Sequence, residues 1–199
     1  GTSGMAQSRV IVASNSYFRL AQNILPLLRQ PFGPEVLTLY IHAELNEEFR
    51  RSTRLKNKFH WVAETTYAEN RSRSISLSLE QKEEIETTYD YMWEHVKEAF
   101  LKPYGKGPSP IDTRIVATAH VLGIEVVTDD RDMIELAKEF GVKHITSLGV
   151  MKRMLEAGHI NDDKVTMVVE QWMYDNDTPH RDWKKEFKKL FGREAPAGY

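Results

Sequence analysis

Short apolar runs alternate with longer amphipathic segments along the chain, and this alternation predicts strands that are separated by helices. The apolar runs cover residues 10–12, 36–39, 124–127 and 142–146. Runs that are so short and so apolar are typical of strands buried on both faces of a parallel sheet. We therefore expect an α/β fold in which helices cover a parallel sheet.

In the first half of the chain, the helices are marked by breaks and by apolar spacing. A helix is expected over residues 16–29, with an interruption near Pro26, and a turn follows at residues 30–34. A second helix should follow the second apolar run, and its buried stripe consists of Ile41, Leu45 and Phe49. Residues 50–76 are polar and basic, and their pattern predicts no particular element.

Capping signals place the remaining helices. Ser78 and Gln81 have the spacing of a capping box, which predicts the start of a long helix that ends before Gly105. Ser109 followed by Pro110 is typical of the start of another helix, which leads to the third apolar run. The later helices are expected over residues 131–140, 147–157, 162–174 and 178–191.

Composition indicates a globular chain and excludes several classes of site. Of the 199 residues, 41% are hydrophobic and 28% are charged, which is far from the composition of a disordered chain. The absence of cysteine excludes disulfide scaffolds, thiolate zinc sites and thiol nucleophiles. No apolar stretch approaches the roughly 20 residues of a membrane helix, and no signal peptide precedes the first strand, so we expect a cytoplasmic protein without membrane contact.

The chain is expected to form one α/β domain over residues 5–150, with a helical extension over residues 151–199 that packs on the same domain. Residues 1–4 precede Met5 and resemble the remnant of a cleavage site added in cloning, so they are left out of the fold prediction. A chain produced by cloning can also carry deliberate substitutions, and position 13, discussed below, is a candidate for one.

Acidic residues are expected to meet at one edge of the predicted sheet. In open parallel sheets, the ligand crevice lies at the carboxyl ends of the strands. Asp130 follows the third strand, Asp112 lies in the first turn of the preceding helix, and Glu44 lies one turn beyond the second strand. Taken singly, each can be a helix cap or a solvated side chain. Together they would repel one another unless a cation neutralised them, and Mg²⁺ with its oxygen ligands meets that need.

The same acidic residues carry a resemblance to the PIN-domain family. Residues 110–133 resemble the second half of a PIN domain: an Asp opens a helix rich in Ile and Ala, then come Gly, a strand and a Thr-x-Asp motif that ends in Asp130. Glu44 precedes a leucine, as the glutamate of the family commonly does. The first strand of the family ends in Asp-Thr-Asn or Asp-Ser-Asn, whereas this strand ends in Ala13-Ser14-Asn15.

The resemblance implies a PIN-like five-stranded parallel sheet flanked by helices and Mg²⁺- or Mn²⁺-dependent cleavage of RNA. Glu44, Asp112 and Asp130 would be the catalytic metal ligands, and Ala13 stands where the family has its first Asp. The supporting residues would be Ser14, Asn15, Thr128 and Asp132. Many bacterial members are VapC-type toxins, so a small antitoxin protein is an expected partner, and many members form homodimers.

Ala13 has two explanations, and both remain open. We prefer a deliberate Asp-to-Ala change, because loss of a metal-binding carboxylate loosens the metal and suppresses the activity of a toxin. The alternative is a naturally degenerate, non-catalytic PIN module that binds RNA or protein. Other folds with acidic strand ends fit less well: a receiver domain needs an acidic pair after the first strand, and a phosphatase of the haloacid dehalogenase type needs Asp-x-Asp there.

A basic segment between the two halves is a candidate RNA-binding surface. Phe59 and Trp61 follow it directly, and its cations are Arg50, Arg51, Arg54, Lys56 and Lys58. Positive charge for phosphates, together with aromatic faces for unstacked bases, suits single-stranded RNA. The other explanation is a solvated helix face whose aromatic residues belong to the core, and the sequence does not separate the two.

Overall fold

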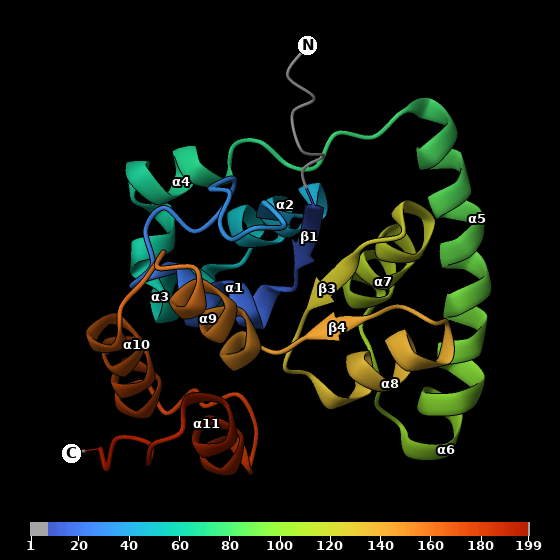
Figure 1. Ribbon diagram of the computed structural model, residues 1–199. Coiled ribbons are helices and arrows are strands. Elements are labelled where there is room, and N and C mark those ends of the chain that lie inside the picture. Colours follow the sequence, from blue (N-terminus) through green and yellow to red (C-terminus); the bar gives the residue numbers. More distant parts are fainter. Residues whose placement is uncertain (1–7, 199) are drawn as a thin grey trace.

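The computed structural model of the chain describes residues 8–198, and Figure 1 shows its elements. The strands are β1 (Ser8–Val12), β2 (Leu37–Ile41), β3 (Glu125–Val127) and β4 (His144–Ile145). The α-helices are α1 (Ser14–Ala21), α2 (Ala43–Arg51), α3 (Thr53–Lys58), α4 (Thr65–Arg71), α5 (Leu79–Val96), α6 (Lys102–Tyr104), α7 (Pro110–Leu122), α8 (Arg131–Glu139), α9 (Ser147–Glu156), α10 (Asp162–Tyr174) and α11 (Trp183–Phe191). A 3₁₀ helix, η1 (His60–Ala63), lies between α3 and α4, and a π-helical segment, η2 (Lys97–Leu101), continues α5. The expected cloning remnant at residues 1–4 lies outside the described residues.

The four strands form one parallel sheet in the order β2-β1-β3-β4. β1 is paired on both sides, and Val10 lies opposite Leu39 of β2 and Glu125 of β3. The prediction of an α/β fold with a parallel sheet covered by helices is confirmed. The expectation of five strands is wrong, since residues 8–198 contain four. After β4 the chain enters α9 at once, because the Thr146 hydroxyl accepts a hydrogen bond from the backbone N–H of Gly149 and caps that helix.

The side chains at the end of β1 alternate between two hydrophobic cores, one on each face of the sheet. Val10 and Val12 belong to the core that α1, α9, α10 and α11 complete. Ile11 and Ala13 belong to the core beneath α5, α7 and α8. Figure 1 shows these two groups of helices on opposite sides of the sheet. Burial on both faces explains why the strand is an unbroken apolar run in the sequence.

Two boundaries in the first half differ from the pattern-based prediction. α1 ends at Ala21, well before its predicted end, and the chain then forms turns around Pro26, whose missing backbone N–H cannot serve a helix. Ile41 ends β2 instead of opening the next helix. The reason is His42, which takes the N-cap position of α2 and accepts a hydrogen bond from the backbone N–H of Glu44 at 3.1 Å.

The predicted starts of the two long helices are confirmed. Ser78 and Gln81 form a capping box, with the Gln81 N–H 3.1 Å from the Ser78 hydroxyl oxygen. Ser109 caps α7 in the same way. The last helix, α11, begins at Trp183 rather than near residue 178, because the backbone N–H of Trp183 closes a turn onto the carbonyl oxygen of His180.

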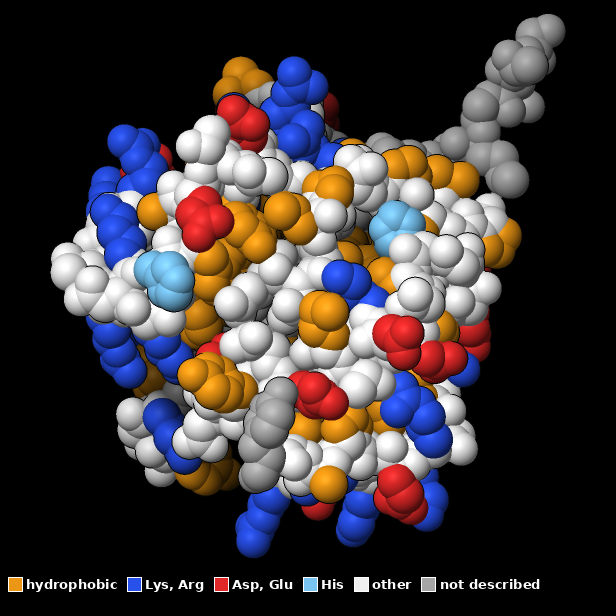
Figure 2. Space-filling view, turned by 90° about the vertical axis from the view of Figure 1, so that its left-hand side faces the viewer, with side chains coloured by type: hydrophobic (Ala, Val, Ile, Leu, Met, Phe, Trp, Pro, Cys, Tyr) orange, Lys and Arg blue, Asp and Glu red, His pale blue; other side chains and the backbone are white. Residues whose placement is uncertain are grey.

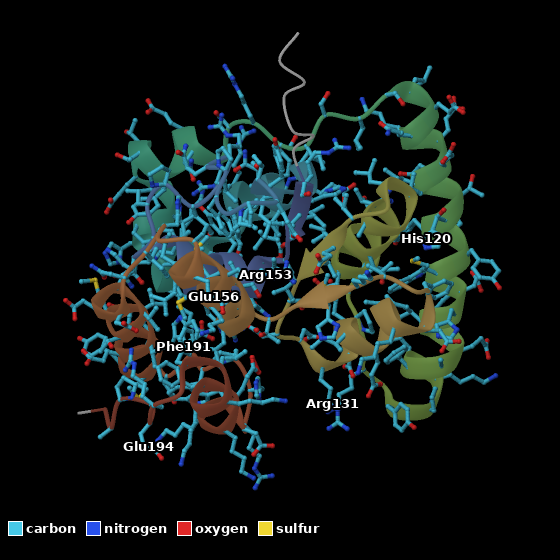
Figure 3. The ribbon with its side chains drawn as sticks, in the orientation of Figure 1. His120, Arg131, Arg153, Glu156, Phe191 and Glu194 are labelled. Atoms are coloured by element: carbon cyan, nitrogen blue, oxygen red, sulfur yellow. The ribbon has the colours of Figure 1, made fainter. Side chains whose placement is uncertain are left out.

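The helices beyond residue 150 share a core with the sheet. Trp172 of α10 and Phe187 of α11 are buried in the same core as one face of β1, and Trp172 Nε1 donates to the carbonyl oxygen of Arg19 at 2.8 Å. Arg153 of α9, labelled in Figure 3, lies 3.4 Å from the carboxylate of Glu125 in β3. Within the described part of the chain, no helix combines the length and the apolar composition that a membrane span requires.

Candidate active site

The sheet has its topological switch point between β1 and β3. The chain leaves β1 for β2 on one side and later crosses to β3 on the other side. Two strands whose connections diverge in this way leave a crevice beyond their carboxyl ends, where ligands of open α/β sheets bind. Ala13 follows β1 at this edge, and its backbone N–H donates to the carbonyl oxygen of Val127, the last residue of β3, at 2.9 Å.

A cavity of about 160 Å³ opens at this crevice. Its lining includes six of the positions that the sequence predicted for the site: Ala13, Ser14, Asn15, Asp112, Thr128 and Asp130. Its apolar wall consists of Phe18, Leu55, Ile111 and Met133. Glu48 and Ser109 complete the lining. Residues from three separate parts of the chain, the ends of β1 and β3 and the start of α7, therefore meet around one small volume.

Asp112 takes its place from the start of α7. Its backbone N–H lies 3.1 Å from the Ser109 hydroxyl, and its carboxylate accepts from the Ser109 backbone N–H at 3.5 Å. Burial in the cavity wall raises the pKa of Asp112, the charge of Asp130 raises it further, and the hydrogen bonds from Ser109 partly oppose this increase. A carboxylate whose pKa is raised in this way is ionised at a cost, and a cation beside it would offset that cost.

Asp130 is held by the start of α8. It is the N-cap residue, and its Oδ1 accepts from the backbone N–H of Met133 at 2.8 Å. The backbone N–H of Asp130 donates to Thr128 Oγ1 at 3.1 Å, which fixes the turn after β3. Oδ2 of Asp130 has no hydrogen-bond partner among residues 8–198, so this oxygen is available to a ligand.

Ala13 occupies a backbone position that suits an acidic residue. It is the N-cap of α1, with φ −74° and ψ 159°, and its methyl group gives the helix no side-chain cap. Asp is among the preferred N-cap residues because its carboxylate accepts from the free N–H groups of the first turn. An aspartate at position 13 would therefore suit the start of α1 and would also face the cavity that Ala13 lines.

Glu44, the remaining predicted metal ligand, does not line the cavity. Its carboxylate lies 3.1 Å from Nε of Arg114, which also pairs with Glu86 and lies over the ring of Tyr89. Glu48, one helical turn later in α2, lines the cavity instead, and burial raises its pKa. Both glutamates border the apolar stripe of α2, so only the packing of the helix decides which one reaches the cavity. The sequence pattern alone therefore does not select Glu48.

Asp132, predicted as a supporting residue, lies in the first turn of α8 but outside the cavity lining. Burial raises the pKa of Asp132, and the negative charge of Asp130 adds to this effect. Asp129, which directly precedes Asp130, has a structural role. It is buried, accepts from the backbone N–H and the hydroxyl of Ser147 at 2.8 and 2.5 Å, and lies 3.1 Å from Nη1 of Arg19. These contacts anchor the turn that carries Asp130.

The basic segment lies directly beside the cavity. Leu55 of α3 lines the acidic cavity, whereas its neighbour Lys56 lines a separate groove together with Arg50 of α2. Phe59 and Trp61 are only 7% and 4% exposed and belong to the core. The core explanation of these two aromatic side chains is therefore confirmed, and stacking of RNA bases on them is not available.

The residues of the cavity fit a hard divalent cation. Mg²⁺ typically takes one or two carboxylates and completes its shell with water and phosphate oxygens. Asp112 and Asp130 supply two carboxylates, and Glu48 lines the same cavity. Over residues 8–198, no three His, Cys, Asp or Glu side chains are close enough together to form a complete ligand group. An aspartate at position 13 would add a further carboxylate at this edge.

Comparisons of the chain with protein-family models, with curated proteins and with solved structures find no match.

Proposed function

We propose that this protein is a metal-dependent endoribonuclease in which Asp112 and Asp130 bind Mg²⁺ or Mn²⁺ and Ala13 replaces a further metal-binding carboxylate. The observation that carries the proposal is the meeting of these three positions at one cavity, at the switch point of a parallel sheet. The resemblance of the same positions to the PIN motif also supports the proposal, because it depends on the order of residues in the chain and not on the cavity.

When bound, such a cation stabilises the negative charge that develops on a phosphodiester under attack and favours ionisation of the attacking water. The chain holds the two carboxylates in place: Asp130 through its cap bond to Met133 and Asp112 through its capping box with Ser109. Ser14 and Asn15 line the same cavity, and hydroxyl and amide groups of this kind can bind substrate oxygens.

The third protein ligand is either Glu44 or Glu48. The resemblance assigns this role to Glu44, but Arg114 neutralises the Glu44 carboxylate in the structure. Glu48 lines the cavity, and burial raises its pKa. The substitutions E44Q and E48Q, each made in a chain that carries an aspartate at position 13, show which glutamate is the ligand. The substitution that removes the ligand should weaken Mn²⁺ binding more than the other.

The decisive experiment is the Ala13→Asp substitution. We expect A13D to cleave single-stranded RNA in Mn²⁺ or Mg²⁺ and to lose the activity in EDTA, whereas A13N, which supplies a cap without a charge, stays inactive. A second substitution, D112N, should abolish the activity of A13D. A folded A13D protein that binds neither cation and cuts no RNA would overturn the proposal.

A second candidate function is a non-catalytic module that binds RNA or protein, and the methyl group of Ala13 in the cavity favours it. This function predicts metal-independent binding and no gain of cleavage in A13D.

Within the nuclease proposal, the finer suggestion is a toxin controlled by a small antitoxin protein. It predicts that production of A13D, but not of the Ala13 protein, arrests the growth of a bacterial host.

A further inference from the structure

A second, larger hollow lies beside α2 and α3, the two helices that contribute Glu48 and Leu55 to the acidic cavity. We call it the basic groove; its volume is about 690 Å³, and it is lined by Asn46, Phe49, Arg50, Lys56, Val62, Ala63, Ala68, Arg71 and Ser72. None of these lining residues is acidic, and three of them are cations. Figure 2 shows the side of the molecule that carries α3 and α4, where Lys and Arg side chains gather along one edge.

Arg71 gives this groove a charge that the protein does not neutralise. The residue is 5% exposed, and its guanidinium donates only to neutral acceptors: Asn46 Oδ1 at 3.3 Å, the Tyr17 hydroxyl at 3.1 Å and the Val62 carbonyl oxygen at 2.6 Å. It also lies against the rings of Tyr17 and Phe49. Among residues 8–198, no carboxylate lies within ion-pair distance of it.

A buried charge without a counter-ion is costly, and buried charges in proteins are normally paired. A guanidinium has five N–H donors, of which the three bonds above use three. The other two have no acceptor in the described part of the chain. Arg50 and Lys56 line the same groove, and of these two only Arg50 has an acidic partner among residues 8–198, Glu47 at 3.0 Å. The groove therefore combines an incompletely paired buried guanidinium with two further cations.

We propose that the basic groove binds a phosphate of the single-stranded RNA whose cleavage site lies in the acidic cavity, with Arg71 as the central contact. The choice of RNA as the source of the phosphate rests on the proposed function. Leu55 and Lys56 are neighbours in α3, one at each hollow, so a strand that leaves the cavity over this helix reaches the groove. Guanidinium groups bind phosphate oxygens in a bidentate manner, which suits the remaining Arg71 donors.

The groove should contact the backbone of the RNA and not its bases. The only aromatic side chain that lines it is Phe49, which is 2% exposed and packs against Phe18 in the core. Base recognition on single strands needs aromatic faces that are open to solvent. Phosphate contacts alone give affinity that is independent of sequence and falls steeply with salt.

Binding of a fluorescent oligouridine, measured by anisotropy in EDTA with the Ala13 protein, tests the inference. We expect K56Q to weaken binding about threefold to fivefold, and R50Q to act in the same direction. The slope of log affinity against log salt should become shallower by about 0.7 for each cation removed. K185Q removes an exposed lysine of α11 and should leave both affinity and slope unchanged.

The role of Arg71 can be tested by NMR on the unsubstituted chain, so the test does not depend on a variant that folds. The NMR signal of its Nε–H group should shift when oligouridine is added, and inorganic phosphate at high concentration should shift it in the same direction. Where R71K folds, it should bind oligouridine at least threefold more weakly, because an ammonium group cannot keep three hydrogen bonds and a bidentate contact. An Arg71 signal that does not move, or K56Q binding as tightly as K185Q, overturns the inference. Tighter, Lys56-dependent binding of a polyglutamate peptide would also overturn it and assign the groove to an acidic protein segment.

Because these measurements use EDTA and Ala13, they separate the two proposals. If A13D cleaves RNA but K56Q binds oligouridine as tightly as the unsubstituted chain, the nuclease proposal stands and the proposal for the basic groove fails. If oligouridine binding depends on Lys56 but A13D cleaves no RNA, the proposal for the basic groove stands and the nuclease proposal fails.

Discussion

The guanidinium of Arg19 lies 3.1 Å from the carboxylate of Asp129, with side-chain exposures of only 9% and 0%. This ion pair joins α1 to the turn after β3, and the same carboxylate holds the start of α9 through Ser147. Arg19 also reaches Asp177, beyond α10, at 3.2 Å. The pair therefore ties together the segments that surround Asp130.

Substitution D129N should destabilise the protein by about 3 kcal/mol, because it leaves the buried Arg19 with only the more exposed Asp177 as an ionic partner and removes the charged acceptor of both Ser147 hydrogen bonds. Urea unfolding at neutral pH measures the change. The matched control is E156Q, which breaks the exposed pair between Glu156 and Lys152 on α9 and should cost less than about 1 kcal/mol. Equal costs for the two variants would show that the Arg19–Asp129 pair does not stabilise the fold.

His42 should make stability depend on pH. Burial, and to a smaller extent the nearby positive charge of Arg114, lower the pKa of His42 to about 4. The unfolded chain takes up this proton near pH 6.5 but the folded chain only near pH 4, so stability from His42 is present above pH 6.5 and is lost as the pH falls towards 4. The total loss is about 3 kcal/mol.

The measurement compares the native chain with H42N over pH 4 to 7, because Asn keeps an acceptor at the N-cap but does not titrate. The native chain should lose stability faster than H42N as the pH falls through this window. Parallel pH profiles would show that His42 is not buried in its neutral form.

Gly107 should tolerate no side chain. A Cβ atom at this position would lie 2.5 Å from Cβ of Phe100, which real structures do not show. G107A should therefore displace the loop that leads to Ser109 and cost about 1–3 kcal/mol. G105A is the comparison, because its new Cβ would meet no atom within 4 Å and only the φ of +70° opposes it, at about 1 kcal/mol. Thermal denaturation distinguishes the two, and a larger loss in G105A would contradict the packing argument.

The acidic cavity should respond to cations in a way that does not depend on catalysis. A13D places another negative charge beside Asp112 and Asp130, so its melting temperature should lie below that of A13N, which has the same shape and no charge. Mn²⁺ should raise the melting temperature of A13D, by an amount equivalent to about 2.7 kcal/mol when the cation is at 100 times its dissociation constant. A13N should show a smaller effect. Equal responses of the two proteins to Mn²⁺ would argue against a metal site.

Parallel topology predicted the meeting of Asp112 and Asp130, because it brings the strand ends to one edge, and the family resemblance added Ala13 to the same site. It did not select Glu48 over Glu44, since both border the same helical stripe and the choice depends on Arg114, which is distant in sequence. The same limit applies to Arg71. Nothing local marks a basic residue as buried when its acceptors lie on three other segments of the chain.

Trp172 and Arg19 are 153 positions apart and share a hydrogen bond, so the core around α1 closes only when α10 arrives. Contacts of such long sequence separation make folding slow, because a large loop must close before they form. During synthesis, β1 and α1 emerge long before the helices that cover them. A nascent chain that stops before α10 would therefore present the apolar faces of β1 and α1 to chaperones and to other unfolded chains.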